Sequence, residues 1–259
     1  DALDAVAREC ALVGSTPLVL PLDVMNHGAQ EEAYNSIIEQ FGRVDILVLN
    51  AGRSQRALAL ETSIEDTRNV MELNVLSPID LSKIVAPSMV ERGSGDIIVI
   101  SSVTGKLPTT LQSTYSASKF ALHGYYDSFR TEVSQHGVNV LLVCPGPVKS
   151  DILSHAIRPN APSSTGKEVF KQDADVMPTE RCTHLILKAL YWRFDEVWIS
   201  KQPILAITYL AEYTPGMVRF LFKKFIGPSR IRAFQGGESI MDLKVMLGHI
   251  FPGFKKSLA

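Results

Sequence analysis

The sequence has few cysteines, almost no net charge and no long hydrophobic run. Its three cysteines, at positions 10, 144 and 182, are too few for a disulfide framework and form no CxxC zinc motif. We therefore expect free thiols in a reducing compartment. The 26 basic and 27 acidic side chains leave a net charge of −1, which argues against nucleic acid as a partner. No stretch reaches the roughly 18–20 apolar residues of a membrane-spanning helix.

Other absences concern the beginning of the chain, its glycines and its histidines. The chain begins Asp1-Ala2-Leu3-Asp4, without an initiator Met or a signal peptide, and its apolar residues already have helical spacing. We therefore expect a fragment that starts inside a secondary-structure element. No segment places closely spaced glycines between a strand and a helix, so a Gly-rich phosphate-binding turn is absent. The six histidines show no HxxxH or HExxH spacing, and we predict no metal site.

The residues that are present predict an α/β fold. Hydrophobic residues make up 46% of the chain and charged residues 20%, which is typical of a globular core. Short apolar runs predict buried strands at 18–22, 46–49, 96–100, 138–143 and 196–199. Segments long enough for helices lie between them, at 28–41, 62–91, 115–135 and 179–191. This alternation predicts a doubly wound parallel sheet with helices on both faces, a three-layer architecture.

Two segments do not follow the alternation. Residues 144–178 contain five prolines with Asn, Ser and Gly, which predicts a long loop of the kind that often covers a substrate. Residues 203–211 are apolar, and residues 213–237 hold five basic and no acidic side chains among aromatic and aliphatic ones. Either these apolar side chains cover a substrate site beneath a solvated basic face, or residues 203–232 form helices on a membrane surface.

A tyrosine and a lysine carry the strongest chemical signal. Tyr115 and Lys119 are four residues apart at the start of a predicted helix, hence on one face. A nearby positive charge favours the phenolate and lowers the pKa of a tyrosine. Such a pair also occurs by chance on many surface helices. However, Ser102, Asn50-Ala51-Gly52 and Pro145-Gly146 all follow predicted strands, at the sheet edge where open α/β folds bind ligands.

With these residues and their order along the chain, the sequence resembles the short-chain dehydrogenase/reductase family. The members of this family are Rossmann-type nicotinamide oxidoreductases. The matching elements are Leu-Asn-Ala-Gly at 49–52, Asn74, Ser102, Tyr115-Ser-Ala-Ser-Lys119 and Pro145-Gly146-Pro147-Val148. Residues 195–203 resemble more narrowly the member-7 branch of the dehydrogenase/reductase subgroup. The relatives in that branch are microsomal enzymes that act on retinoids, steroids and other lipophilic carbonyls.

The resemblance implies catalytic roles for four residues. Tyr115 would exchange a proton with the substrate oxygen, and Ser102 would hold that oxygen in place. Lys119 would lower the pKa of Tyr115 and bind the nicotinamide ribose. Asn74, at a break in its helix, would tie a water molecule to Lys119. The alternatives are a helix N-cap for Ser102 and a local bond that kinks the helix for Asn74.

The resemblance also implies a set of cofactor contacts. Asp23 would accept a hydrogen bond from the adenine amino group, although a simple turn residue is the alternative. The carboxamide would be contacted by Val148 and by Ser150, which replaces the usual Thr. The remaining cofactor-binding positions are Asn50, Ala51, Gly52, Tyr115, Lys119, Pro145 and Gly146. The subgroup favours NADP(H), and NAD(H) stays an alternative because the residues that select between them lie in the absent first strands.

The sequence therefore predicts an oxidoreductase that transfers a hydride between NADP(H) and a lipophilic carbonyl or alcohol. Residues 1–200 would form an incomplete Rossmann-type domain, and residues 201–259 a C-terminal helical extension. The resemblance implies a homodimer or tetramer associated with the endoplasmic reticulum membrane. A non-catalytic binding protein and a membrane-associated scaffold of the same fold remain alternatives.

The missing first strands have a physical consequence for the predicted sheet. Strands at 18–22 and 46–49 would each face an empty position with unpaired backbone groups. We therefore expect residues 1–259 alone to bind no dinucleotide tightly, and we expect activity to belong to a longer natural chain.

Overall fold

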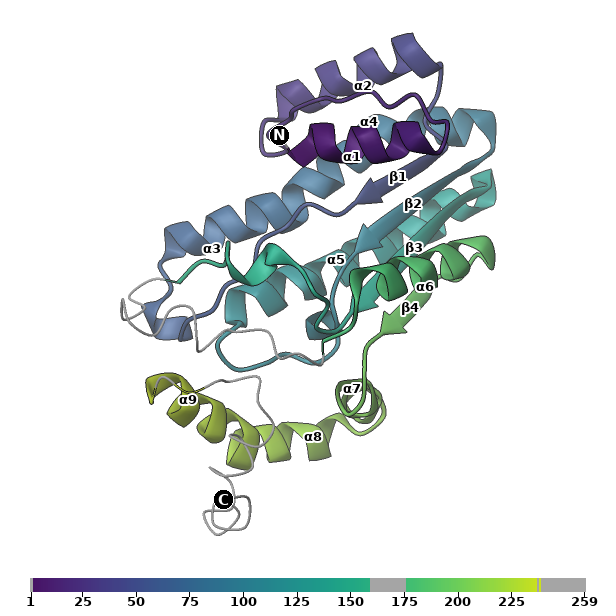
Figure 1. Cartoon of the computed structure of the whole chain (residues 1–259). Helices are drawn as coiled ribbons and strands as arrows, with labels where there is room; N and C mark the ends of the chain where they lie inside the picture. Colours follow the sequence, from purple (N-terminus) through teal and green to yellow (C-terminus); the bar gives the residue numbers. More distant parts are fainter. Residues whose placement is uncertain (1, 159–175, 237, 239–259) are drawn as a thin grey trace.

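The computed structural model describes residues 2–158, 176–236 and 238 and contains a four-stranded parallel sheet (Figure 1). The strands lie side by side in chain order, and their bounds agree with the predicted ones within two residues. They are β1 (Ile46–Leu49), β2 (Gly95–Ile100), β3 (Val138–Pro145) and β4 (Glu196–Ile199). Because all four strands are parallel, their carboxyl ends meet at one edge.

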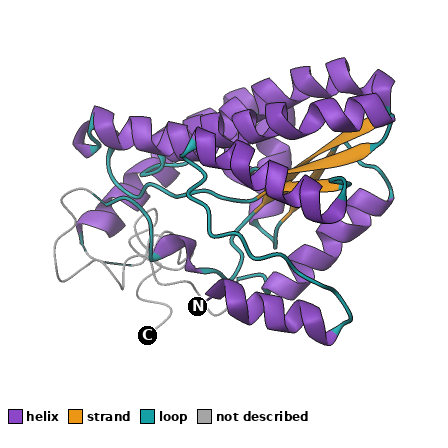
Figure 2. Cartoon of the chain, turned by 90° about the horizontal axis from the view of Figure 1, so that it is seen from above, coloured by secondary structure: helices purple, strands orange, loops and turns teal. Residues whose placement is uncertain are grey.

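Helices cover both faces of the sheet, which confirms the predicted three layers (Figure 2). On one face, Ile97 and Val99 of β2 pack with side chains of α4 (Ser77–Arg92) and α5 (Ser113–Val133), and α2 (His27–Phe41) adds Tyr34. On the other face, Ile98 packs with α6 (Thr179–Tyr191). Adjacent residues of β2 thus point to opposite faces, and both faces are buried.

One predicted strand, at residues 18–22, is not formed. This segment is extended and half-buried, but no described segment pairs with it. A strand needs a neighbour to satisfy its backbone N–H and C=O groups, so an apolar run alone does not make one. The predicted open edge is present at β1, where the side chains of Ile46 and Val48 remain 47% and 53% exposed.

The segment predicted as one long helix at 62–91 has an irregular turn in the middle. It consists of α3 (Ile64–Met71), a π-helical turn at Glu72–Leu76 and α4. Ser63 begins it by accepting a hydrogen bond from the amide of Asp66, and Gly93 ends it in the left-handed conformation. The break predicted at Asn74 lies within the π-helical turn.

The C-terminal part forms a layer of helices below the carboxyl edge of the sheet (Figure 1). It comprises α7 (Ile204–Tyr213), α8 (Pro215–Leu221), a π-helical turn (Phe222–Ile226) and α9 (Gly227–Gln235). Among the described residues, no helix is both long and apolar enough to cross a membrane. Residues 159–175 of the predicted loop at 144–178 lie outside the described residues, as does the end of the extension.

Smaller elements complete the described chain. The helix α1 (Ala2–Leu12) has no buried residue. Single 3₁₀ turns lie at Ala59–Glu61, Val103–Gly105, Ser134–His136 and Asp151–Leu153. Cys10, Cys144 and Cys182 are all free thiols, as predicted.

Candidate active site

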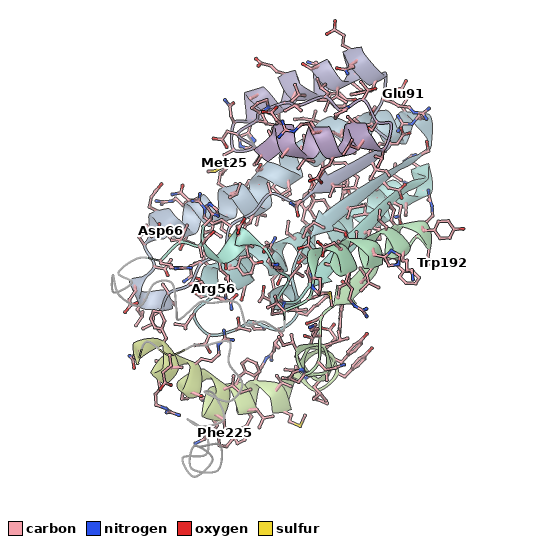
Figure 3. The ribbon with its side chains drawn as sticks, in the orientation of Figure 1. Met25, Arg56, Asp66, Glu91, Trp192 and Phe225 are labelled. Atoms are coloured by element: carbon pink, nitrogen blue, oxygen red, sulfur yellow. The ribbon has the colours of Figure 1, made fainter. Side chains whose placement is uncertain are left out.

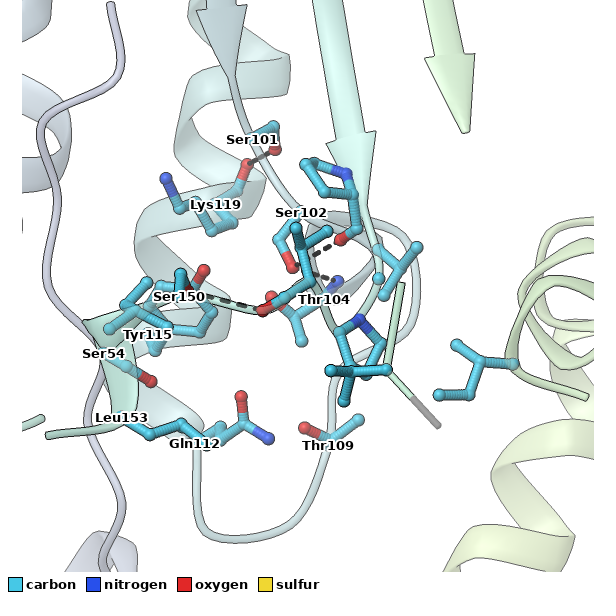
Figure 4. Close-up of a pocket in the computed structure, with 18 of the residues that line it drawn as sticks. Ser54, Ser101, Ser102, Thr104, Thr109, Gln112, Tyr115, Lys119, Ser150 and Leu153 are labelled. Carbon is cyan, nitrogen blue, oxygen red and sulfur yellow. Dashed lines mark hydrogen bonds between the residues drawn. The ribbon is translucent and has the colours of Figure 1, made fainter. Parts of the chain in front are cut away.

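The carboxyl edge of the sheet opens onto a cavity of about 570 Å³ (Figure 4). Residues after β1, β2 and β3 line it on the sheet side, and the C-terminal helices line it on the other. A volume of several hundred Å³ is in the range of sites that hold drug-sized ligands. Its aliphatic and aromatic lining includes Leu107, Ile152, Leu153, Ile186, Ile204, Ile207, Phe222 and Ile226.

Ser102, Tyr115 and Lys119, predicted to act together, all line this cavity (Figure 4). Ser102 directly follows β2, and its Oγ accepts a hydrogen bond from the amide of Thr104 at 3.1 Å. The predicted alternative of an N-cap for Ser102 is therefore also realised, because this bond begins a short 3₁₀ turn. Tyr115 and Lys119 lie one turn apart on α5.

The pKa of the Tyr115 phenol is raised, whereas the sequence predicted that it would be lowered. Burial is the largest cause, because it disfavours the phenolate. The positive charge of Arg56 and a hydrogen bond with the Ser102 side chain oppose this shift but do not cancel it. At neutral pH the phenol therefore holds its proton.

The ammonium group of Lys119 lies over the ring of Tyr115. Its Nζ is 5.7 Å from the ring centroid and donates a 2.8 Å hydrogen bond to the carbonyl of Ile100. Burial lowers the pKa of Lys119 to about 8. The charge that lowers the pKa of Tyr115 comes from Arg56 instead of the expected lysine.

Asn74 lies behind the cavity wall and joins three segments. Its side-chain amide donates to the carbonyl of Arg53 and to Ser118 Oγ, both at 2.9 Å, and its oxygen accepts from the amide of Arg53 at 2.8 Å. The π-helical turn points this side chain at α5, one residue before Lys119. Such turns are frequent at functional sites.

Most of the predicted cofactor-binding residues lie together at the cavity. Those that line it are Asn50, Gly52, Tyr115, Lys119, Pro145, Gly146, Val148 and Ser150. Ala51 and Asp23 are not among the described lining residues. Asp23 is exposed and accepts a hydrogen bond from the amide of Met25 at 2.9 Å, which is the turn role named as its alternative.

Two glycines on the sheet side of the cavity allow neighbouring side chains to approach the backbone closely. A Cβ atom on Gly52 would lie 3.2 Å from Asn74 Oδ1 and 3.7 Å from Lys119 Nζ. A Cβ atom on Gly146 would lie 2.1 Å from Ser200 Oγ, which is a steric clash. Gly146 therefore requires the smallest residue, whereas a larger residue at Gly52 would displace Asn74 slightly.

Two arginines of the cavity were not predicted. Arg56 follows β1 in an irregular loop, where no periodic pattern singles it out. Arg230 belongs to the basic stretch for which a solvated face was one interpretation, yet it is buried on α9. No signal short of the fold itself indicates that these two residues line the same cavity.

A buried polar cluster beneath the site was also missed. His123, Cys144 and Glu196 place donor atoms within 4.8 Å of one another. Lys106 Nζ is 2.9 Å from Glu196, and burial raises the pKa of the Cys144 thiol, which keeps it protonated. The carboxylate of Glu196 is thus already paired with an ammonium group of the protein.

Comparisons with known proteins agree with this geometry. The family model for short chain dehydrogenase matches residues 1–160. The chain is 38% identical over 240 residues to dehydrogenase/reductase SDR family member 7 from Homo sapiens, covering 91% of this chain and 70% of that protein. This bears out the resemblance to the member-7 branch.

Solved structures give the same result. A short-chain dehydrogenase from Streptomyces avermitilis has a TM-score of 0.69 and 25% identity, over 85% of this chain and 83% of that one. An alcohol dehydrogenase from Thermococcus sibiricus, complexed with 5-hydroxy-NADP, has a TM-score of 0.65 and 21% identity. The match covers 77% of this chain and 81% of that one. The chain therefore belongs to the short-chain dehydrogenase/reductase family and is an oxidoreductase that acts on an alcohol or carbonyl group.

Proposed function

We propose that the protein transfers a hydride between NADP(H) and a lipophilic carbonyl or alcohol, such as a retinoid or a steroid. The observation that carries this proposal is the burial of Ser102, Tyr115 and Lys119 at one wall of a large, mostly apolar cavity. Such a cavity binds apolar surface through the hydrophobic effect, and its few polar groups orient one polar end of the ligand.

The cavity residues fit the nicotinamide half of the cofactor. Gly52 and Gly146 line the sheet side of the cavity without side chains of their own, and Asn50, Val148 and Ser150 line the same cavity. Lys119 would bind the ribose, and Val148 and Ser150 the carboxamide. When bound, the dinucleotide supplies the hydride for reduction and accepts it for oxidation. The preference for NADP(H) over NAD(H) rests on the likeness to the member-7 branch.

Each catalytic side chain has a role that its surroundings support. Tyr115 donates its phenolic proton to the carbonyl oxygen during reduction, and its raised pKa keeps that proton in place beforehand. Ser102, hydrogen-bonded to the phenol, holds the substrate oxygen. Lys119, with its pKa lowered to about 8, is the next group that can exchange a proton. Asn74 would hold the water that links Lys119 to solvent.

Replacement of Tyr115 tests this function. In the full-length protein, Tyr115→Phe should reduce NADPH-dependent reduction of retinal or of a steroid ketone by about 10²–10⁴-fold, because the proton donor is lost. NADPH binding, followed by nicotinamide fluorescence, should stay nearly unchanged. Product formation is measured by chromatography.

The control for this experiment is Tyr125→Phe. Tyr125 lies on the same helix, is half-buried and stacks on Phe129, away from the cavity lining. Its replacement should leave turnover within about twofold of the original rate. Full turnover by Tyr115→Phe would refute the assigned role and favour the non-catalytic alternative.

We also propose that the C-terminal helices contact the endoplasmic reticulum membrane and that the protein forms a homodimer or tetramer. The outer side of these helices combines exposed Phe220 and Phe225 with exposed Arg219, Lys223 and Lys224. Apolar and basic side chains on one surface favour binding to anionic lipid headgroups. Exposed apolar side chains on α3, its π-helical turn and α5 (Ile64, Leu76 and Phe120) support association of copies there.

A further inference from the structure

The cavity wall contains two buried arginines that the family chemistry does not require. Arg56 is 9% exposed and Arg230 is 8% exposed, and both line the cavity. They come from the loop after β1 and from α9, so the fold brings together residues from distant parts of the chain. Arg56 lies between the sheet and the C-terminal helices (Figure 3).

Each guanidinium has two nitrogen atoms whose donors no described residue satisfies. In the part of the chain that the structure describes, Nε and Nη1 of Arg56 and Nε and Nη2 of Arg230 are buried without a hydrogen-bond partner. No described carboxylate pairs with either arginine, and no Asp or Glu is among the described residues that line the cavity. The hydroxyls of Ser54, Thr104 and Thr109 on the same wall are also buried and unpartnered.

The two arginines destabilise each other in this arrangement. Burial and the charge of Arg230 lower the pKa of Arg56 to about 9, and burial lowers the pKa of Arg230 to about 10. Both groups remain protonated at neutral pH. Buried cations without a counter-charge cost several kcal/mol, so proteins seldom retain them unless a ligand supplies that charge. A guanidinium presents a planar fork of donors that matches a carboxylate.

The position of the pair also links it to the reacting group. The charge of Arg56 acts on the phenol of Tyr115, so the two side chains share one region of the cavity. A ligand whose oxygen lies at Ser102 and Tyr115 therefore occupies the cavity that Arg56 also lines. The remaining lining is largely apolar, which suits a hydrocarbon body between or beside two polar ends.

We propose that the substrate is a lipophilic carbonyl compound that also carries a carboxylate, and that Arg56 and Arg230 bind this carboxylate. The inference rests on the proposed function and narrows its substrate class from lipophilic carbonyls in general to oxo acids. Arg56 and Arg230 thus determine specificity, while the chemistry at Tyr115 is unchanged.

Matched acids and esters test the proposal in the full-length protein. The substrates are ω-oxo fatty acids of increasing chain length, each paired with its methyl ester, with NADPH in excess. At the best chain length, kcat/KM for the acid should exceed that for the ester by about tenfold or more, since a charged hydrogen-bonded pair is worth about 1.5–3 kcal/mol. Equal or better turnover of the ester at every length would overturn the proposal.

Two variants and a control assign the preference to the arginines. Arg56→Gln and Arg230→Gln should each remove most of the preference for the acid by raising the KM of the acid. Arg230→Gln should leave ester turnover nearly constant, whereas Arg56→Gln should also change kcat for both substrates, because its charge acts on Tyr115. Arg232→Gln, an exposed position on the same helix, should keep the preference. If Arg56→Gln and Arg230→Gln leave the KM of the acid and the preference over the ester unchanged, the arginines do not bind the carboxylate, and the proposal is wrong.

Thermal unfolding provides a readout that does not depend on turnover. Decanoate should raise the Tm of the original protein and decanamide should not, because only the carboxylate neutralises the pair. Without ligand, Arg56→Met and Arg230→Met should unfold at higher temperature than the original protein, since each removes a buried uncompensated charge. Neither variant should respond to decanoate.

The two readouts separate failure of the inference from failure of the proposed function. Stabilisation by decanoate that both variants abolish, without turnover of any oxo compound, would support the carboxylate site and contradict the proposed reaction. Turnover of esters and acids alike, without stabilisation by decanoate, would contradict the carboxylate site and support the reaction.

Discussion

Gly52 lies where the smallest side-chain addition would disturb two polar groups behind the site. An alanine Cβ there would be 3.2 Å from Asn74 Oδ1, closer than most real Cβ contacts, so Asn74 must shift by a few tenths of an ångström. We predict that Gly52→Ala lowers kcat by about tenfold, because small displacements of positioning groups have large effects on rate. The free energy of unfolding should change by less than about 1 kcal/mol, since alanine restricts the unfolded chain.

The matched control for Gly52 is Gly216→Ala. Gly216 lies in α8, and a Cβ atom there meets nothing within 4 Å. This variant should keep kcat and be slightly stabilised, as expected for a glycine replaced inside a helix. Steady-state kinetics and thermal unfolding of both variants measure the difference. An unchanged kcat in Gly52→Ala would show that the contact with Asn74 does not position the site.

At the scale of residues, the sequence identifies the reacting groups but not their electrostatics. Ser102, Tyr115 and Lys119 could be predicted because their spacing and their places after strands and on one helix determine where they lie. The charge near Tyr115 could not be predicted, because Arg56 is brought to it by a loop with no regular pattern. Burial, which raises the pKa of Tyr115, is a property of the packed fold alone.

At the scale of elements, one carboxylate ties strand β4 to helix α5 and to the loop after β2. Glu196 lies 2.9 Å from Lys106 Nζ and 3.3 Å from His123 Nδ1, and it accepts a hydrogen bond from Trp198 Nε1. Burial alone would raise the pKa of Glu196. The hydrogen bonds with His123, Trp198 and Lys106 outweigh burial and lower the pKa to about 2.

This shift predicts a pH dependence of stability. Because the pKa of Glu196 is about 2 in the folded state and near 4.5 in the unfolded state, its contribution is complete above pH 4.5. It amounts to about 3 kcal/mol and is lost as the pH falls from 4.5 toward 2. Glu196→Gln should flatten the pH dependence of the unfolding free energy in this window, measured by urea denaturation.

The control for Glu196 is Glu91→Gln. Glu91 is exposed at the end of α4, as Figure 3 also shows, so its replacement should leave the pH profile unchanged. An identical profile for Glu196→Gln and the original protein would contradict the role of Glu196 as a tie between strand and helix.

Secondary structure could be predicted where apolar periodicity and breakers coincide and the element finds its neighbour in the fold. The helix at 179–191 and the strand at 196–199 begin and end where the sequence indicates, because apolar periodicity and breakers coincide there. The run at 18–22 carries the same apolar signal but finds no neighbouring strand among the described residues. Strand formation depends on a partner distant in sequence, and periodicity does not contain this information.

At the scale of the whole molecule, the C-terminal helices have an inner side that lines the cavity and an outer side that is exposed. Their inner side chains, including Ile207, Phe222 and Ile226, line the cavity. This agrees with the predicted alternative in which these apolar side chains cover a substrate site. Their outer side exposes Phe220 and Phe225. The two alternatives drawn from the sequence are therefore compatible, because different faces of the same helices carry them.

The proposed contact of the outer face with a membrane leads to a prediction for the whole chain. Phe220→Ser combined with Phe225→Ser should lower binding to vesicles of anionic phospholipid at least about threefold in sedimentation, because buried aromatic surface anchors interfacial helices. Raised salt should weaken binding of the original protein, since each basic side chain near the surface contributes about 1 kcal/mol through screened attraction. Leu60→Ser, at a fully exposed position on a 3₁₀ turn outside the C-terminal helices, is the matched control and should bind as the original protein does. Unchanged sedimentation of the double variant, with the control also unchanged, would mean that these helices cover the cavity and do not contact lipid.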